Sequence, residues 1–165
     1  MEGTRTYSWV DPRDLAKLSG EMDGLAFSRH LLEAGEAGIM PIAATLGFRL
    51  AEIDRGHAVL TGELGEHLYN PIGMVHGGYA ATLLDSACGC AVHTRLSAAQ
   101  AYTTLELKVA FHRPPTRDTG KVRAEGGVVT FGRRAAFAEA TLKDEAGRLY
   151  ATATSTLLVM DAPSR

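Results

Sequence analysis

The spacing of hydrophobic residues divides the chain into two parts that meet near residue 40. The first 20 residues are polar and irregular, and the proline at position 12 predicts a short helical turn. Between residues 23 and 38, apolar side chains recur at the spacing of an amphipathic helix that ends near Gly35. The pattern changes after Pro41, where segments typical of strands begin.

Six later segments carry the composition and bounding turn residues of β-strands. They span residues 45–54, 56–64, 102–113, 120–132, 134–144 and 147–160. The third segment alternates most clearly, which predicts one buried and one exposed face. Its apolar positions are Leu105, Leu107, Val109 and Phe111, and its polar positions are Thr104, Glu106 and Lys108.

One long helix is predicted from Gly77 to His93, between the second and third strand segments. It carries two stripes of side chains at helical spacing. The first stripe is apolar and consists of Ala80, Leu83, Leu84, Ala87 and Ala91. The second is small and polar and consists of Thr82, Asp85, Ser86, Gly89 and His93. The first stripe is expected to face a sheet, and the second to face a different surface.

Strands clustered around a single long helix favour the α+β class, with a curved antiparallel sheet packed on that helix. We expect residues 1–40 to be an N-terminal extension with a short helix. Residues 41–162 are then expected to form one domain, a size large enough to bury a core.

The start of the long helix and its acidic residue carry candidate chemistry. A helix start presents unpaired backbone N–H groups and a partial positive charge, and glycine lets an oxygen approach the backbone closely. Gly77 and Gly78 are therefore candidates for an oxyanion hole. Asp85 is a candidate nucleophile or general base. Plainer explanations stay open, because a helical Asp is often merely solvated and a Gly-Gly pair often only forms a turn.

The spacing of these groups predicts an assembly. Eight residues separate Gly77 from Asp85, which corresponds to ~12 Å along an α-helix. One substrate carbonyl cannot contact both groups of the same chain. A shared site therefore requires two chains whose helices run antiparallel about a two-fold axis, and we expect an obligate homodimer with two interfacial sites.

Composition and charge exclude several classes of protein. With 22% charged residues and a formal net charge of −2, nothing favours nucleic acid or an anionic membrane as a partner. There is no run of 18 apolar residues, and the N-terminus lacks the pattern of a signal peptide, so we expect a cytoplasmic protein. Cys88 and Cys90 form no C-x-x-C pair and are expected to be small buried thiols.

Sequence motifs for two common classes of hydrolase are missing. The six histidines show no H-E-x-x-H or H-x-H spacing, which disfavours a metal hydrolase. No G-x-S-x-G segment occurs, which disfavours a serine hydrolase. We therefore expect neither a metal nor a cofactor.

The segment Asn70-x2-Gly73-x2-His76-Gly77-Gly78 followed by Asp85 resembles the signature of the hotdog-fold acyl-CoA thioesterases, closest to the phenylacetate-pathway (PaaI-like) type. The strand that ends in Arg-Pro after residue 112 is also similar, and the resemblance covers roughly residues 41–160. It implies a hotdog fold, in which a curved antiparallel sheet wraps a long helix. It also implies hydrolysis of acyl-CoA by a homodimer or homotetramer, with coenzyme A as part of the substrate.

The resemblance assigns roles to individual residues. Asp85 would attack the thioester or activate water, and the Gly77 N–H would polarise the carbonyl. Asn70 would position the water or the thioester, and His76 would hold its loop in place. Thr104 matches a Ser/Thr that the family places near the nucleophile in the partner subunit.

Coenzyme A carries phosphates, so basic residues are expected near the mouth of the site. Arg113 is the first candidate, followed by Arg133 and Arg134, and Gly78 is a further candidate for substrate binding. The length and chemistry of the acyl group stay open.

Two alternatives remain at this point. The first is an acyl-thioester hydratase or dehydratase of the same fold, which is disfavoured because no Asp is followed five positions later by a His. The second is a non-catalytic module that binds acyl-CoA, which would be expected to carry an output domain.

Overall fold

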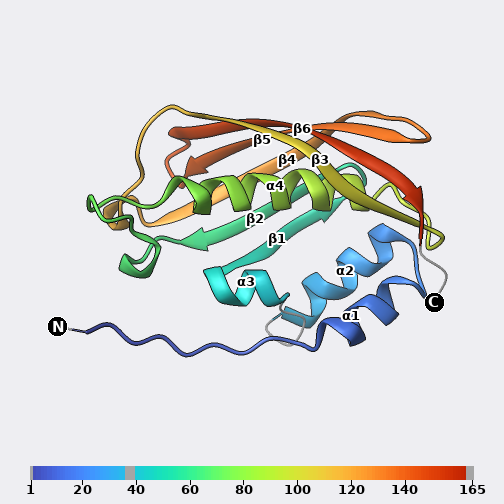
Figure 1. Cartoon of the computed structure of the whole chain (residues 1–165), viewed down its shortest axis with the longest axis horizontal. Helices are drawn as coiled ribbons and strands as arrows, with labels where there is room; N and C mark the ends of the chain where they lie inside the picture. Colours follow the sequence, from blue (N-terminus) through green and yellow to red (C-terminus); the bar gives the residue numbers. More distant parts are fainter. Residues whose placement is uncertain (1, 36–39, 163–165) are drawn as a thin grey trace.

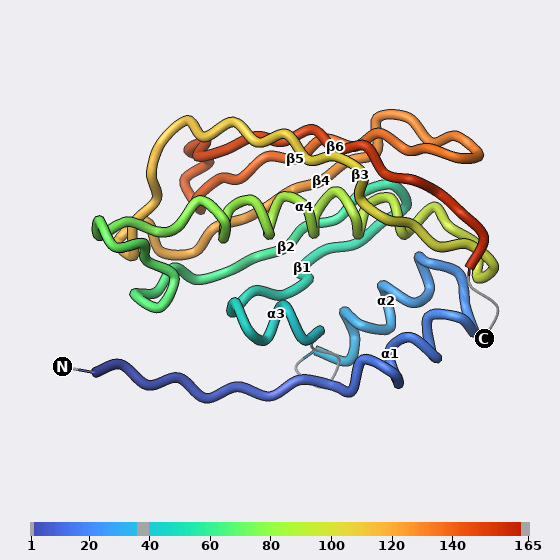
Figure 2. Tube along the Cα trace, viewed as in Figure 1, coloured from blue at the N-terminus to red at the C-terminus, as the bar shows by residue number. Residues whose placement is uncertain are grey.

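The computed structural model describes residues 2–35 and 40–162, and within these ranges six strands form one antiparallel sheet. The strand order is β1-β2-β4-β5-β6-β3. The sheet curves around one long helix, α4, which runs between β1 and β2 on one side and β3 and β6 on the other (Figures 1 and 2). The expected α+β hotdog arrangement is confirmed. The strands are β1 Phe48–Asp54, β2 His57–Glu63, β3 Gln100–Phe111, β4 Lys121–Phe131, β5 Ala135–Asp144 and β6 Leu149–Asp161.

Helix α4 spans Gly77–His93, the bounds that the sequence predicts. The predicted apolar stripe faces the sheet, and its five residues are each 3% exposed or less. Four of them, Ala80, Leu83, Leu84 and Ala87, pack with residues of β2, β4, β5 and β6 in a single core. Because burying a leucine side chain contributes about 2 kcal/mol, this stripe fixes how the helix is rotated against the sheet.

The predicted faces of β3 are only partly right. Leu107 and Val109 pack against the core, whereas Leu105 is 61% exposed and Phe111 is 57% exposed. The ladder between β3 and β6 skips Leu105, as a β-bulge does. The bulge changes the phase of the alternation, so Thr104 joins the side chains that face α4.

Within the described residues, three α-helices lie before β1. Helix α1 spans Pro12–Ser19 and α2 spans Gly24–Ala34, with its C-cap at Gly35 as predicted. The part of the expected α2 segment beyond Gly35 lies outside the described residues. A short helix that the sequence analysis missed, α3, spans Pro41–Leu46 and ends at Gly47, whose φ is +74°. The predicted first strand therefore starts too early, because this left-handed glycine separates α3 from β1.

Helix α2 packs against β1 and against the C-terminal end of α4. The Gly24 N–H donates to the Leu96 carbonyl oxygen at 3.0 Å. A Cβ atom at Gly24 would lie 1.7 Å from the carbonyl oxygen of His93, so only glycine permits this approach. The ring of Phe27 meets the His93 ring edge-on at 5.4 Å. The N-terminal extension is thereby joined to the end of the central helix.

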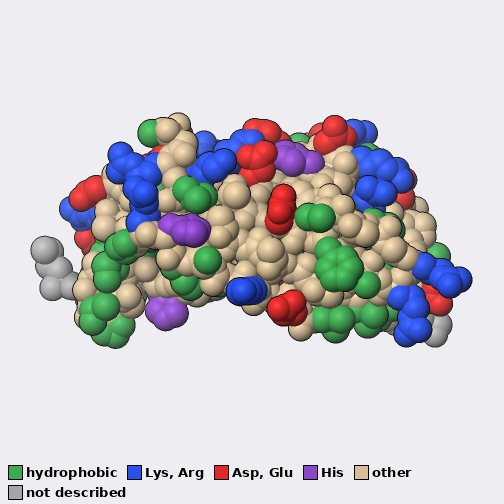
Figure 3. Space-filling view, turned by 90° about the horizontal axis from the view of Figure 1, so that it is seen from above, with side chains coloured by type: hydrophobic (Ala, Val, Ile, Leu, Met, Phe, Trp, Pro, Cys, Tyr) green, Lys and Arg blue, Asp and Glu red, His purple; other side chains and the backbone are tan. Residues whose placement is uncertain are grey.

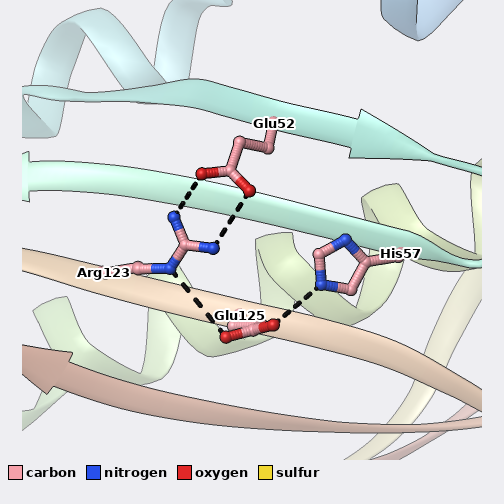
Figure 4. Close-up of polar contacts among 4 residues, drawn as sticks. All are labelled: Glu52, His57, Arg123 and Glu125. Carbon is pink, nitrogen blue, oxygen red and sulfur yellow. Dashed lines mark hydrogen bonds and ion pairs between the residues drawn. The ribbon is translucent and has the colours of Figure 1, made fainter. Parts of the chain in front are cut away.

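The face of the sheet turned away from α4 carries a polar network across three strands (Figure 4). Arg123 binds both carboxylate oxygens of Glu52, and Glu125 accepts a 2.9 Å hydrogen bond from the His57 ring. Hydrogen bonding to Arg123 lowers the pKa of Glu52, and hydrogen bonding to His57 lowers the pKa of Glu125. Exposed pairs of this kind contribute little stability.

No helix in the described residues is long and apolar enough to cross a membrane.

Tyr79, in the first turn of α4, is 4% exposed, and its hydroxyl has no hydrogen-bond partner among the described residues. Burial raises the pKa of Tyr79 to about 12. The hydroxyl lies against β2, where a Cβ atom at Gly62 would be 2.0 Å from the oxygen and 3.3 Å from the ring carbon that carries it. The ring therefore fits the core because position 62 has no side chain.

This contact predicts a non-additive pair of substitutions. Gly62→Ala should lower the free energy of unfolding by about 2 kcal/mol, because the new methyl group overlaps the hydroxyl. Tyr79→Phe should be neutral or stabilising by about 1 kcal/mol, since it removes an unpaired buried group. Urea unfolding of the double variant should show that Tyr79→Phe restores most of the stability that Gly62→Ala removes.

Gly127→Ala is the matched control, because a Cβ atom at this strand glycine would meet nothing within 4 Å. Its stability should stay within about 0.5 kcal/mol of the parent protein. Strictly additive energies for the Gly62 and Tyr79 substitutions would contradict the proposed contact.

Candidate active site

The first turn of α4 presents one backbone donor for a ligand. The His76 Nδ1 atom accepts a 2.8 Å hydrogen bond from the Gly78 N–H, and the His76 carbonyl accepts from the Tyr79 N–H at 2.9 Å. The Gly77 N–H has no acceptor among the described residues. Gly78 therefore contributes its N–H to the helix cap, and Gly77 is the donor left at the start of the helix.

The loop before α4 is folded around Asn70. Its Oδ1 atom accepts hydrogen bonds from the backbone N–H groups of Ile72 and Met74, both at 3.1 Å. The His76 N–H donates to the Leu68 carbonyl at 2.8 Å and closes the base of the loop. The side-chain oxygen of Asn70 is thus used within the loop, and its Nδ2 group is the part that can serve a ligand.

Asp85 lies midway along α4 and is half-buried. The Thr104 hydroxyl, on β3, donates a 3.0 Å hydrogen bond to the Asp85 Oδ1 atom. Both residues belong to the same chain, so this pair forms without a partner subunit. The bond fixes the rotation of the carboxylate, and Oδ2 accepts no hydrogen bond from the described residues.

Strand β3 covers α4 at three levels. At the N-terminal end, a Cβ atom on Gly77 would lie 3.2 Å from the Phe111 ring. In the middle, Thr104 bonds Asp85. One turn further on, the Tyr102 ring lies over Gly89. The sequence analysis predicted no role at the site for Tyr102 or Phe111. The signal that could have indicated one is the matched spacing of small residues on the helix and large residues on the strand.

A hollow of about 390 Å³ opens beside the start of α4. Gly77, His76, Phe111 and Arg113 are among the residues that line it. The Arg113 guanidinium lies 6.0 Å from the centre of the Tyr150 ring, which restricts where this exposed side chain can lie. The structure thus brings Arg113 to the Gly77 end of the helix.

The other two arginine candidates lie elsewhere. Arg133 and Arg134 are in the turn between β4 and β5, and the Arg134 carbonyl accepts from the Val159 N–H at 3.0 Å. This turn is at the opposite end of the sheet from the start of α4 (Figure 1). Neither side chain lines the hollow beside Gly77 in its own chain.

The two thiols near Asp85 are held protonated. Burial first, and then the negative charges of Asp85 and Glu139, raise the pKa of Cys88 to about 12. Burial and then Asp85 raise the pKa of Cys90 to about 11. Both cysteines are free, and a protonated thiol is a poor nucleophile. Across residues 2–35 and 40–162, no three His, Cys, Asp or Glu side chains gather in a way that could hold a metal ion.

Comparison with known proteins places these features in a family. Residues 72–151 match the model of the thioesterase superfamily. The proofreading thioesterase EntH of Klebsiella pneumoniae is 28% identical over 111 residues, which are 67% of this chain and 80% of that protein. A thioesterase family protein from Silicibacter pomeroyi is 30% identical, with a TM-score of 0.71 over 82% of this chain and 99% of that chain.

The phenylacetic acid degradation protein PaaI of Thermus thermophilus, solved as a variant, is 29% identical with a TM-score of 0.66. The match covers 72% of this chain and 98% of that one. This chain belongs to the thioesterase superfamily. It is a thioesterase of the PaaI-like type.

The helix cap gives a prediction about His76. His76→Ala removes the side-chain acceptor for the Gly78 N–H and should lower the free energy of unfolding by about 1 kcal/mol. His76→Asn keeps an acceptor of suitable length and should retain most of that stability. Urea unfolding of the two variants measures the difference. Equal stabilities for the Ala and Asn variants would show that the side chain does not cap the helix.

Proposed function

We propose that this thioesterase hydrolyses acyl-CoA thioesters at sites formed between two antiparallel copies of the chain. The observation that carries the proposal is the arrangement of α4. It starts with a Gly77 N–H that lacks an acceptor among the described residues and holds Asp85, oriented by Thr104, eight residues later. The two groups are ~12 Å apart along one rigid helix, so each chain supplies one half of a site.

An exposed strand supports the pairing. Of the two edge strands, β1 packs against α2, whereas β3 is a 12-residue edge with a largely exposed Leu105. Long edge strands with exposed apolar side chains are prone to pair with another chain. Figure 3 shows hydrophobic side chains at the surface among charged ones in the view from above, the side on which β3 and β6 lie. Pairing of two β3 strands about a two-fold axis would continue the sheet and place the two α4 helices antiparallel.

The chemistry follows from the groups that meet in such a pair. The Gly77 N–H of one copy polarises the thioester carbonyl, helped by the positive end of the helix dipole. The free Oδ2 atom of Asp85 in the other copy attacks the carbonyl carbon or takes a proton from an attacking water. The resulting oxyanion is held by the same N–H group.

Collapse of that intermediate breaks the carbon–sulfur bond and releases coenzyme A as a thiolate, which takes up a proton. If Asp85 attacked directly, the acyl group is left as a mixed anhydride, which water then hydrolyses to the free acid. Either route consumes one water and gives one acid and one thiol. Thr104 keeps the carboxylate turned toward the substrate, and the scheme calls for neither a metal nor a cofactor.

Arg113 gives the substrate a charged partner. It lines the hollow beside Gly77, and its guanidinium is suited to a phosphate of coenzyme A. The Oδ1 atom of Asn70 is used within its loop, and we assign its Nδ2 group the role of donor to the thioester or to the attacking water.

The first test is turnover. With acetyl-, octanoyl- and benzoyl-CoA as substrates, release of free thiol should be measurable for the parent protein. Asp85→Asn should lower kcat by about 10²-fold or more, because it removes the carboxylate that serves as nucleophile or base. Asp14→Asn, an exposed carboxylate in α1, is the control and should behave like the parent protein. Full activity in Asp85→Asn would refute the catalytic role. Acyl-CoA binding without any turnover would indicate a binding module instead.

The second test addresses the shared site. Asp85→Ala and Asn70→Ala would each be inactive, and mixing the two with subunit exchange should give hybrid dimers that hold one intact site. Random exchange at equal concentrations should restore about a quarter of the parent activity. Each variant mixed with itself is the control. Native mass spectrometry first verifies that the subunits have exchanged. If activity does not recover after that, the two-chain site is refuted.

A further inference from the structure

An aromatic side chain closes the helix face next to Asp85. A Cβ atom at Gly89 would lie 2.6 Å from the Tyr102 hydroxyl oxygen and 3.2 Å from two carbons of its ring. A contact under 3.0 Å would force the ring to move, so the ring holds this position because residue 89 is glycine.

Tyr102 lies close to Asp85 by two measures, one along α4 and one along β3. Gly89 follows Asp85 by four residues, on the same helix face and ~6 Å along the axis. Tyr102 precedes Thr104 by two residues, so the two side chains leave β3 on the same face. Burial, followed by the charges of Cys90 and Asp85, raises the pKa of Tyr102. The hydroxyl therefore stays protonated beside the carboxylate.

The Tyr102 ring begins a row of aromatic side chains. Its centre lies 5.9 Å from the His93 ring, and the His93 ring lies 5.4 Å from Phe27 of α2. Burial lowers the pKa of His93, so this ring is uncharged at neutral pH. The row covers α4 from Gly89 to its C-terminal end. Behind Tyr102, as seen from Asp85, the molecule is thus filled with aromatic and apolar groups.

We propose that Tyr102 is the residue that limits the size of the acyl group beside Asp85, so that this thioesterase prefers short or compact acyl groups to long chains. The inference rests on the proposed function, because it assumes that the thioester carbonyl reaches Asp85. A longer acyl chain cannot extend over Gly89 while the ring occupies that space. Removal of the ring opens an apolar channel toward His93 and Phe27, in which additional methylene groups gain binding energy.

The test compares substrates of increasing length in two variants with opposite effects. Tyr102→Val opens the channel, and the ratio of kcat/KM for octanoyl-CoA to that for acetyl-CoA should rise at least about 10-fold over the parent protein. Gly89→Ala pushes the ring toward Asp85, and the same ratio should fall. Tyr102→Phe keeps the ring and should leave the ratio unchanged.

Leu142→Ala in β5 is the matched control, since it also truncates a buried side chain but one that lies in the main core cluster, to which Tyr102 is only peripheral. It should lower stability without changing the ratio. Circular dichroism and unfolding curves show whether each variant folds. If Tyr102→Val does not fold, Gly89→Ala still tests the proposal.

The outcomes separate the two proposals. Turnover by the parent protein with an unchanged ratio in Tyr102→Val and Gly89→Ala overturns the role of Tyr102 and leaves the proposed function standing. A preference of the parent protein for octanoyl-CoA over acetyl-CoA also overturns the role of Tyr102. Absence of turnover on every substrate overturns both proposals.

Discussion

The fixed distance between two reactive groups on one helix is the constraint on which the rest of this molecule depends. An α-helix is stiff, so the backbone positions of Gly77 and Asp85 stay ~12 Å apart along its axis. A thioester carbonyl needs a donor and a carboxylate within hydrogen-bonding reach of the same atoms. The fold leaves one stripe of α4 polar and the edge strand β3 without a second neighbouring strand. Under the proposed function, activity and self-association are then consequences of the same geometry.

Strand β3 orients the carboxylate within this constraint. Its bulge at Leu105 shifts the alternation so that Tyr102 and Thr104 face the helix, and the strand then matches small residues of α4 with larger ones of its own. A regular strand would point Leu105 inward and leave Asp85 against an aliphatic side chain. Bulges often re-aim side chains next to active sites, and the energy of the lost ladder contact is small compared with an unpaired, half-buried carboxylate.

Much of the fold follows from local signals in the sequence. The bounds of α4 were predictable because a loop rich in Asn, Pro and Gly precedes it and two stripes run its whole length. The six strands were predictable from turn residues between alternating segments. The bulge at Leu105 was not, since it depends on how β3 pairs with β6 and the sequence pattern is compatible with a regular strand. Helix α3 was missed because six residues carry too little periodicity to separate a helix from a strand.

The candidate site was predictable in its residue types but not in its hydrogen bonds. Asp85 and Gly77 follow from the chemistry of a helix start and a lone carboxylate, whereas the capping bond of His76 depends on loop geometry. Under the proposed function this bond has a chemical consequence, because it uses the Gly78 N–H in the helix cap and leaves Gly77 as the backbone donor. With one donor, an oxyanion is stabilised less than in a two-donor hole. Under the proposed function, more of the barrier must then be lowered by the Asp85 carboxylate, whose orientation is set by the Thr104 hydroxyl.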